Sequence, residues 1–200
     1  NTTSTYETMS EDELTKLISE TNAQVQKLEQ RKNELSSQLN ALKDTADKNE
    51  KAAEIAKQNA QTNGILSGRL AATGEGVVIR ISQGSKQKID SAILFTLLEE
   101  LRNSGAEVIE INNVRVVTST YISGTAGSLV CDGTKLKSPF TIRAIGDSDN
   151  LQNAVNLAGG VGSRLKVKYG ATVSVSPSDK VMIKSTRQAP QYTYAHVIGQ

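Results

Sequence analysis

Few residues in this chain have the types and spacing that enzyme catalysis requires. The one histidine, His196, lies in the C-terminal tail, so a Ser-His-Asp or Cys-His arrangement in a folded core would lack its general base. The one cysteine, Cys131, allows no internal disulfide, and its strand-like surroundings favour an inert thiol. We therefore expect a protein that is not an enzyme and that carries no metal ion or cofactor.

Two other patterns resemble functional sites but have simpler explanations. Gly159-Gly160-Val161-Gly162 has the composition of a phosphate-binding loop, but it follows a predicted helix instead of joining a strand to a helix. Glu99 and Glu100 are adjacent on a predicted helix, so their carboxylates do not face each other. The first pattern predicts a break in a helix, and the second predicts a solvated helix face.

One group of polar residues is a candidate binding site. Asn112 and Arg115 lie on one predicted strand, Arg143 lies on another, and Asp147 follows it. If the two strands are neighbours, the four side chains can converge at one sheet edge and offer donors to a carboxylate or to a partner's backbone. The alternative is structural, with an ion pair between Arg143 and Asp147 that supports the start of a helix.

Caps, turns and apolar patterning predict the elements that position these residues. Asp90 and Asp147 have a residue type preferred at helix N-caps, and the helix after Asp90 has one apolar face, closed by Gly105. The segment Glu107–Val117 alternates as a strand, with a kink or bulge at its two asparagines. Further strands are expected at Val77–Ser82, Ser128–Cys131, Phe140–Ile145, Thr172–Val175 and Val181–Ile183, with a turn at Asp132-Gly133 and a short helix at Val161–Tyr169.

The order of these elements is strand, helix, a run of strands, helix and strand. Two strand–helix units around a block of strands predict an α+β domain in which helices cover one face of a mixed sheet. This arrangement is a ferredoxin-like plan, in the split βαβ variant.

A heptad pattern runs through the first third of the chain. Apolar or small residues recur from Leu14 to about Asn63 at steps of four and three, which predicts one long helix with a narrow apolar stripe. β-branched residues at a positions and leucine at d positions favour a parallel homodimeric coiled coil. The alternatives are a hetero-oligomeric coil, a helix packed on its own domain, and an isolated helix. The expected dimerisation residues are Leu14, Ile18, Val25, Leu28, Lys32, Leu35, Leu39 and Leu42.

The chain is expected to consist of a polar N-terminal stub (1–12), a coiled-coil helix (13–63), a glycine-containing hinge (64–75), an α+β domain (76–186) and a C-terminal tail (187–200). Gly64 is the expected end of the helix. A net charge of +2 without a basic run gives no sign of a nucleic-acid partner. The chain starts with Asn and has no membrane-length apolar stretch, so a membrane anchor would lie in a missing upstream segment.

Two blocks of sequence resemble a known family. Leu101–Ile109 with Ile111–Arg115 resembles the LRxxGAEAIxINGQR block of the YlxW/YlxX-like proteins of Gram-positive bacteria, and Ser138–Asp147 resembles their PYxIxAIGD block. The likeness covers about residues 64 to 198, and the family is known as a domain of unknown function, DUF 881. The resemblance implies a single-pass membrane protein whose coiled coil and α+β domain are extracytoplasmic, loosely linked to the cell envelope and cell division.

Together these features predict a scaffold or interaction protein of the bacterial cell envelope. It would be membrane-anchored, would dimerise through its coiled coil and would contact envelope or division proteins. The competing function is an extracytoplasmic sensor that binds a small ligand or a cell-wall fragment. A deep pocket with convergent polar groups would favour the sensor, and a flat apolar patch would favour protein partners.

Overall fold

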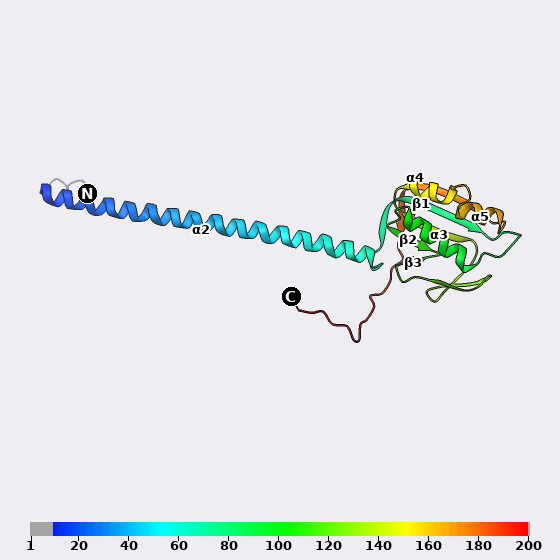
Figure 1. Cartoon of the computed structure of the whole chain (residues 1–200). Coiled ribbons are helices and arrows are strands. Elements are labelled where there is room, and N and C mark those ends of the chain that lie inside the picture. The colour runs from blue at the N-terminus through cyan, green and yellow to red at the C-terminus, as the bar shows by residue number, and fades with distance from the viewer. Residues whose placement is uncertain (1–9, 200) are drawn as a thin grey trace. The chain divides into compact units, whose positions relative to one another are not determined.

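The computed structural model describes residues 10–199 of the 200-residue chain. It divides into two compact units, and the boundary between them lies between Gln58 and Asn59. The described part of the first unit is helical, and the second unit contains the strands and three further helices (Figure 1). The predicted α+β class and the long N-terminal helix are confirmed.

Helix α2 (Glu11–Leu66) is 56 residues long and begins with a reciprocal cap. The amide of Glu13 donates to Ser10 Oγ (3.4 Å), and the amide of Ser10 donates to Glu13 Oε2 (3.0 Å). Acidic residues in the first turn also suit the positive end of the helix dipole. The helix therefore starts inside the predicted stub 1–12, of which residues 1–9 lie outside the described range.

The apolar stripe of α2 is exposed in the single chain. Leu28 is 70% exposed and Leu42 is 69% exposed. The stripe also contains Ile18, Val25, Leu35 and Leu39, all about half exposed or more. The helix is confirmed, and its pairing into a coiled coil stays a prediction.

Helix α2 ends in a Schellman motif at Gly68. The amide of Gly68 donates to Ile65 O (3.0 Å), the amide of Arg69 donates to Gly64 O (2.8 Å), and Gly68 has a φ of 75°. The prediction that Gly64 ends the helix is therefore wrong. The predicted hinge at 64–75 also needs correction, because its first residues are helical and strand β1 (Ala72–Ser82) takes its last ones.

The main sheet has five strands in the order β3-β2-β7-β1-β8. All neighbouring strands are antiparallel. A second sheet has three strands in the order β4-β5-β6. The remaining strands are β2 (Val108–Ile111), β3 (Val114–Val116), β4 (Ile122–Thr125), β5 (Ser128–Cys131), β6 (Thr134–Leu136), β7 (Phe140–Ile145) and β8 (Thr172–Ile183).

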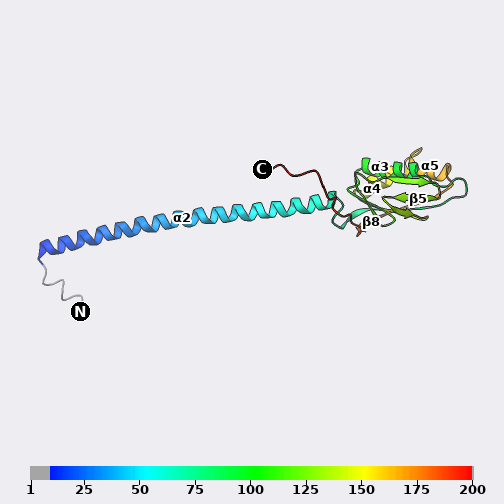
Figure 2. The same cartoon turned by 90° about the horizontal axis from the view of Figure 1, so that it is seen from below.

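The prediction of a mixed sheet is wrong for a topological reason. Strand β7 lies between β1 and β2, and strand β1 lies between β7 and β8. Strands joined by a helical crossover are therefore parallel but never adjacent. The crossovers contain α3 (Ser91–Asn103), α4 (Ser148–Asn156) and α5 (Val161–Val167), and these three helices lie together on one side of the strands (Figure 2).

Two pairs of turn residues form tight hairpins. Asn112 and Asn113 have φ values of 44° and 64°, as in a type I′ turn, so Glu107–Val117 is not one kinked strand but the hairpin β2–β3. Asp132 and Gly133 likewise join β5 to β6, as predicted. Conversely, the two strands expected in 172–183 form the single strand β8, with a bulge opposite Gly74 and Gly76.

The core lies between the main sheet, its three helices and the second sheet. The five residues predicted for the apolar face of α3 are all buried, and they are Ile93, Leu94, Leu97, Leu98 and Leu101. Asp90 caps this helix by accepting from the amide of Ile93 (2.9 Å) and from Tyr169 Oη (2.7 Å). Burial and the bond to Asp90 raise the pKa of Tyr169 to about 12. Asp90 therefore joins the start of α3 to the segment after α5.

Candidate functional site

Arg115 is a buried structural residue and not an exposed donor. Its Nη1 donates to Leu70 O (2.8 Å) and Ser185 O (3.0 Å), and its Nη2 donates to Ile65 O (3.0 Å). Only 2% of the residue is exposed. Burial lowers the pKa of the guanidinium, and the charge of Glu110 opposes this shift. Arg115 therefore joins the end of α2, the segment before β1 and the segment after β8.

Arg187 lies on the same corner of the domain. Its amide donates to Gly68 O (2.7 Å), its Nε donates to Arg115 O (2.9 Å), and its guanidinium also pairs with Asp132. The predicted tail 187–200 therefore begins one residue too early, because residue 187 belongs to the folded domain. Residues 188–199 have no regular secondary structure.

Arg143 pairs with Glu110 rather than with Asp147. Its Nη1 lies 3.2 Å from Glu110 Oε2, and Glu110 stands opposite Arg143 on one side and Arg115 on the other. Ile142 and Ala144 point into the core that α3 covers, so Arg143 faces the other side of the sheet. Asp147 instead caps α4 by accepting from the amide of Asn150 (2.9 Å).

Asn112 stabilises the β2–β3 turn against strand β7. Its Nδ2 donates to Lys137 O (2.9 Å), and its Oδ1 accepts from the amide of Thr141 (2.8 Å). The four predicted site residues thus have four separate sets of partners. The expected convergence is wrong, and so is the alternative of an Arg143–Asp147 ion pair. Of the four residues, Arg143 lines the hollow described next.

This hollow lies on the sheet face opposite the helices and has a volume of about 440 Å³. Glu110 is the one carboxylate among its lining residues and is almost fully buried, whereas the cations are more exposed. The lining residues are Val78, Glu110, Asn113, Arg143, Ser178, Lys180, Val181, Met182 and Lys184. We call this feature the open-face hollow.

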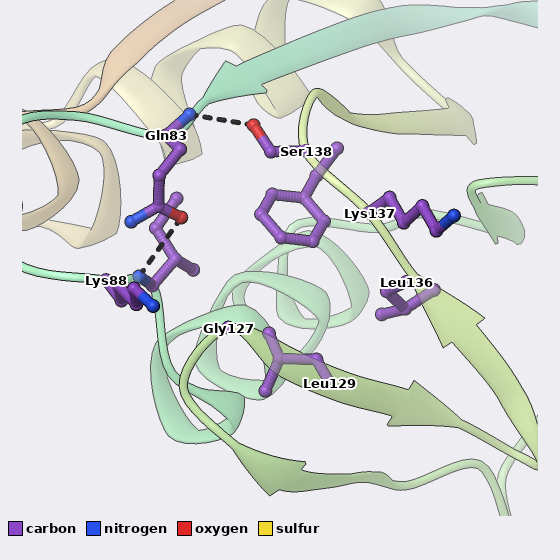
Figure 3. Close-up of a pocket in the computed structure, with 9 residues that line it drawn as sticks. Gln83, Lys88, Gly127, Leu129, Leu136, Lys137 and Ser138 are labelled. Carbon is purple, nitrogen blue, oxygen red and sulfur yellow. Dashed lines mark hydrogen bonds between the residues drawn. The ribbon is translucent and has the colours of Figure 1, made fainter.

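A second hollow of about 290 Å³ lies where the two sheets meet the loop before α3 (Figure 3). Its floor is apolar, and Lys88 and Lys137 stand at its rim. Ser138 Oγ accepts from the amide of Gln83 (2.9 Å), so both polar groups are used within the protein. The apolar floor consists of Ile89, Leu129, Leu136 and Phe140. We call this feature the inter-sheet hollow.

The residues considered for catalysis lie apart from both hollows. Cys131 is fully buried, and burial raises the pKa of its thiol while Arg187 partly opposes the shift. His196 is exposed. Gly159 and Gly160 separate α4 from α5, which confirms the predicted helix break. No group of three or more metal-binding side chains occurs among residues 10–199.

Sequence reasoning missed Glu110 and the lysines of the open-face hollow. Glu110 had a detectable signal, because it is the one charged residue in the apolar run Val108–Ile111. Such a carboxylate is solvent-exposed or held by buried cations. Lys180 and Lys184 gave no signal, since exposed lysines are common on edge strands and in the segments beside them.

Comparison with known proteins places this domain in a bacterial family. Residues 59–196 match the family described as "Bacterial protein of unknown function (DUF881)". The chain therefore belongs to the DUF881 family, which confirms the resemblance seen in its sequence.

Individual relatives agree with this assignment. The chain is 34% identical to the UPF0749 protein Rv1825 of Mycobacterium tuberculosis, over 82% of this chain and 57% of that protein. It is 30% identical to the UPF0749 protein YlxW of Bacillus subtilis, over 58% of this chain and 54% of that protein. The chain thus spans little more than half the length of these relatives.

A crystal structure of an uncharacterized conserved protein from Mycobacterium tuberculosis has a similar fold. The TM-score is 0.63, with 35% sequence identity, and the match covers 70% of this chain and 99% of that one. Within residues 10–199, no helix combines the length and the apolar character needed to cross a membrane.

Proposed function

We propose that this protein is a non-enzymatic scaffold of the bacterial cell envelope that dimerises through α2. It would be anchored in the membrane by a segment upstream of this chain, with α2 and the α+β domain on the extracytoplasmic side and envelope or division proteins as partners. The observation that carries the proposal is the exposed apolar stripe of α2. Exposed leucines repeated over many turns are costly to leave in water.

The dimensions of α2 support a spacing role. At about 1.5 Å per residue, a helix of 56 residues is about 84 Å long. A second copy of the chain would cover the stripe with a/d contacts. Lys32 at an a position would help to fix the register of the two chains.

The oligomeric state tests this proposal directly. We expect static light scattering to give a dimer mass for the intact chain and a monomer mass after removal of residues 1–58, because the stripe is lost and the second compact unit is kept. In the intact chain, Leu28→Asp should also give a monomer, since a charge at the seam cannot be buried without a partner. A monomeric intact chain would contradict the proposal.

We also infer that the domain is a variant of the ferredoxin-like split βαβ plan. The strand order β2-β7-β1-β8, with each crossover spanning one inserted strand, supports this classification. Strand β3 and the sheet β4-β5-β6 would then be additions to the basic plan.

The inter-sheet hollow supports the second candidate function, a sensor for a small ligand or cell-wall fragment. Its apolar floor and its two rim lysines would suit a molecule that has an apolar part and a carboxylate. Titration with soluble muropeptides should shift the methyl NMR signals of Leu129 and Leu136, and leave those of the exposed Leu157 unchanged. Lys88→Gln with Lys137→Gln should weaken binding, whereas unchanged methyl signals would contradict the sensor for these ligands.

A further inference from the structure

The sheet face opposite α3, α4 and α5 has a polar part beside the buried apolar cluster of Val108, Ile145, Val181 and Ile183. Cross-strand register places Arg143 beside Val78, and Val78 beside Ser176. In the next row, Arg80 stands between Thr141 and Ser174. Side chains of directly opposed residues lie on the same face of an antiparallel sheet. Two arginines and a series of hydroxyl groups therefore share this face.

The open-face hollow carries a net positive charge. Arg143, Lys180 and Lys184 line it together with a single carboxylate, that of Glu110. This carboxylate is 4% exposed and already pairs with Arg143, with Arg115 on its other side. Its negative charge is therefore not offered to solvent, whereas both lysines are exposed and form no ion pair within the described residues.

Arg143 is held in place by one hydrogen bond and has further N–H donors available for a ligand. Its side chain is one-third exposed, and one hydrogen bond, from Nη1 to Glu110, fixes its position. A guanidinium has five N–H donors in a fixed plane, which suit the paired oxygens of a carboxylate or phosphate. Because Glu110 orients the group, little side-chain entropy remains to be lost when an anion binds.

The cations continue beyond the hollow. Arg80 is exposed and lies diagonally from Arg143 on the neighbouring strand, a separation of about 7–8 Å for such positions. Ser174 and Ser176 of β8 add exposed hydroxyl donors along the same face. Asp179, which is also exposed, adjoins Lys180 and offsets part of its charge. The row of cations therefore extends further than a single small anion could reach.

We propose that this face binds a linear polyanion, a polymer with repeating phosphate or carboxylate groups. Arg143 would bind one anionic group of the polymer in the open-face hollow. Lys180 and Lys184 would neutralise the neighbouring anionic groups, and Arg80 would contact the polymer where it continues across β1. No aromatic side chain is among the residues that line the hollow. Nucleic-acid bases would find no stacking platform there, so a polymer without bases fits this face better than a single-stranded nucleic acid.

The test titrates the full chain with inorganic polyphosphate as the probe and measures binding by calorimetry at several salt concentrations. We expect binding that weakens as salt rises. Lys180→Gln with Lys184→Gln should reduce the slope of log K against log [salt] by about 1.4, because each contact to a single-stranded polyanion contributes about 0.7. Arg143→Lys keeps the charge but loses the planar donors, so it should weaken binding with a smaller change in slope.

The matched control removes the same charge from the opposite side of the sheet. Arg164 and Lys166 are exposed on α5, and Arg164→Gln with Lys166→Gln should leave polyphosphate affinity unchanged. An equal loss in this control would overturn the proposal, because binding would then depend on net charge alone. Thermal melting should be unchanged in both double variants, since the four side chains lie at the surface.

Two other probes separate this polymer from other anionic partners. Tighter binding of a single-stranded oligonucleotide of equal charge would overturn the proposal in favour of a nucleic acid. Binding to vesicles that contain anionic lipid, without binding to polyphosphate, would overturn it in favour of a membrane surface. The proposal does not depend on dimerisation, because the mass of the chain and its polyanion affinity are measured separately.

Discussion

Replacing Arg115 by methionine is expected to lower the free energy of unfolding of the α+β unit by about 3–5 kcal/mol. The change leaves the carbonyls of Ile65, Leu70 and Ser185 without their buried donor. It also removes one of the two cations beside the buried carboxylate of Glu110. Urea unfolding followed by tyrosine fluorescence measures the loss, because the domain contains Tyr121 and Tyr169 and the protein has no tryptophan.

Arg143→Met is the matched control for this prediction. Arg143 also neighbours Glu110, but its side chain is partly exposed and forms a single ion pair. We expect a loss of about 1 kcal/mol, as for a charged hydrogen bond near the surface. Equal losses in the two variants would show that Arg115 has no special structural role. Pairing Arg143→Met with Asp147→Asn should give additive effects, since the two residues do not touch.

Truncation of the α2 stripe is expected to have the second large effect. If the stripe is buried in a dimer, Leu28→Ala and Leu35→Ala should each lower the free energy of unfolding, by about 2–5 kcal/mol for each buried leucine that is truncated. Ala53→Ser should change stability little, because an alanine buries much less apolar area. Thermal melts followed by circular dichroism at several protein concentrations measure both effects. The melting temperature of the intact chain should rise with concentration, as expected for a folded dimer.

Unchanged melting curves would contradict this prediction. If Leu28→Ala, Leu35→Ala and Ala53→Ser all leave the melting curve unchanged, the leucines are as exposed in solution as they are in the single chain. A heptad seam would then have no structural role in this protein.

Local patterns in the sequence predicted most of the domain's individual elements. The apolar face of α3, its Asp90 cap and strands β5 and β7 were all placed correctly. Each depends on residues close together in the chain. The hairpin at Asn112 and Asn113 was missed because two consecutive asparagines fit a bulge as well as a type I′ turn. The short strands β4 and β6 have too few residues to show alternation.

The pairing of strands was harder to predict than the strands themselves. Nothing near Phe140–Ile145 indicates that β7 inserts between β1 and β2, because the contacts that decide it come from distant parts of the chain. That insertion sets the partners of Arg143. It places Glu110 directly opposite, so an ion pair within the sheet replaces the expected contact with Asp147.

The buried role of Arg115 depends on segments that are far from it in sequence. Its acceptors are the backbone carbonyls of residues 65, 70 and 185. Every residue type has such a carbonyl, so the sequence does not show which ones accept a hydrogen bond. An arginine in a strand therefore looked like a polar surface residue. The apolar neighbours Val114 and Val116 were the one hint of burial.

The Gly68 motif has a mechanical consequence. Because α2 continues as regular helix to Leu66 and its last carbonyls are bound by Arg69, Leu70 and Arg115, the short segment 67–71 that leads to β1 is held against the helix end. Tension on the last helical residues, 59–66, which belong to the second unit, would therefore be transmitted to β1 through these hydrogen bonds.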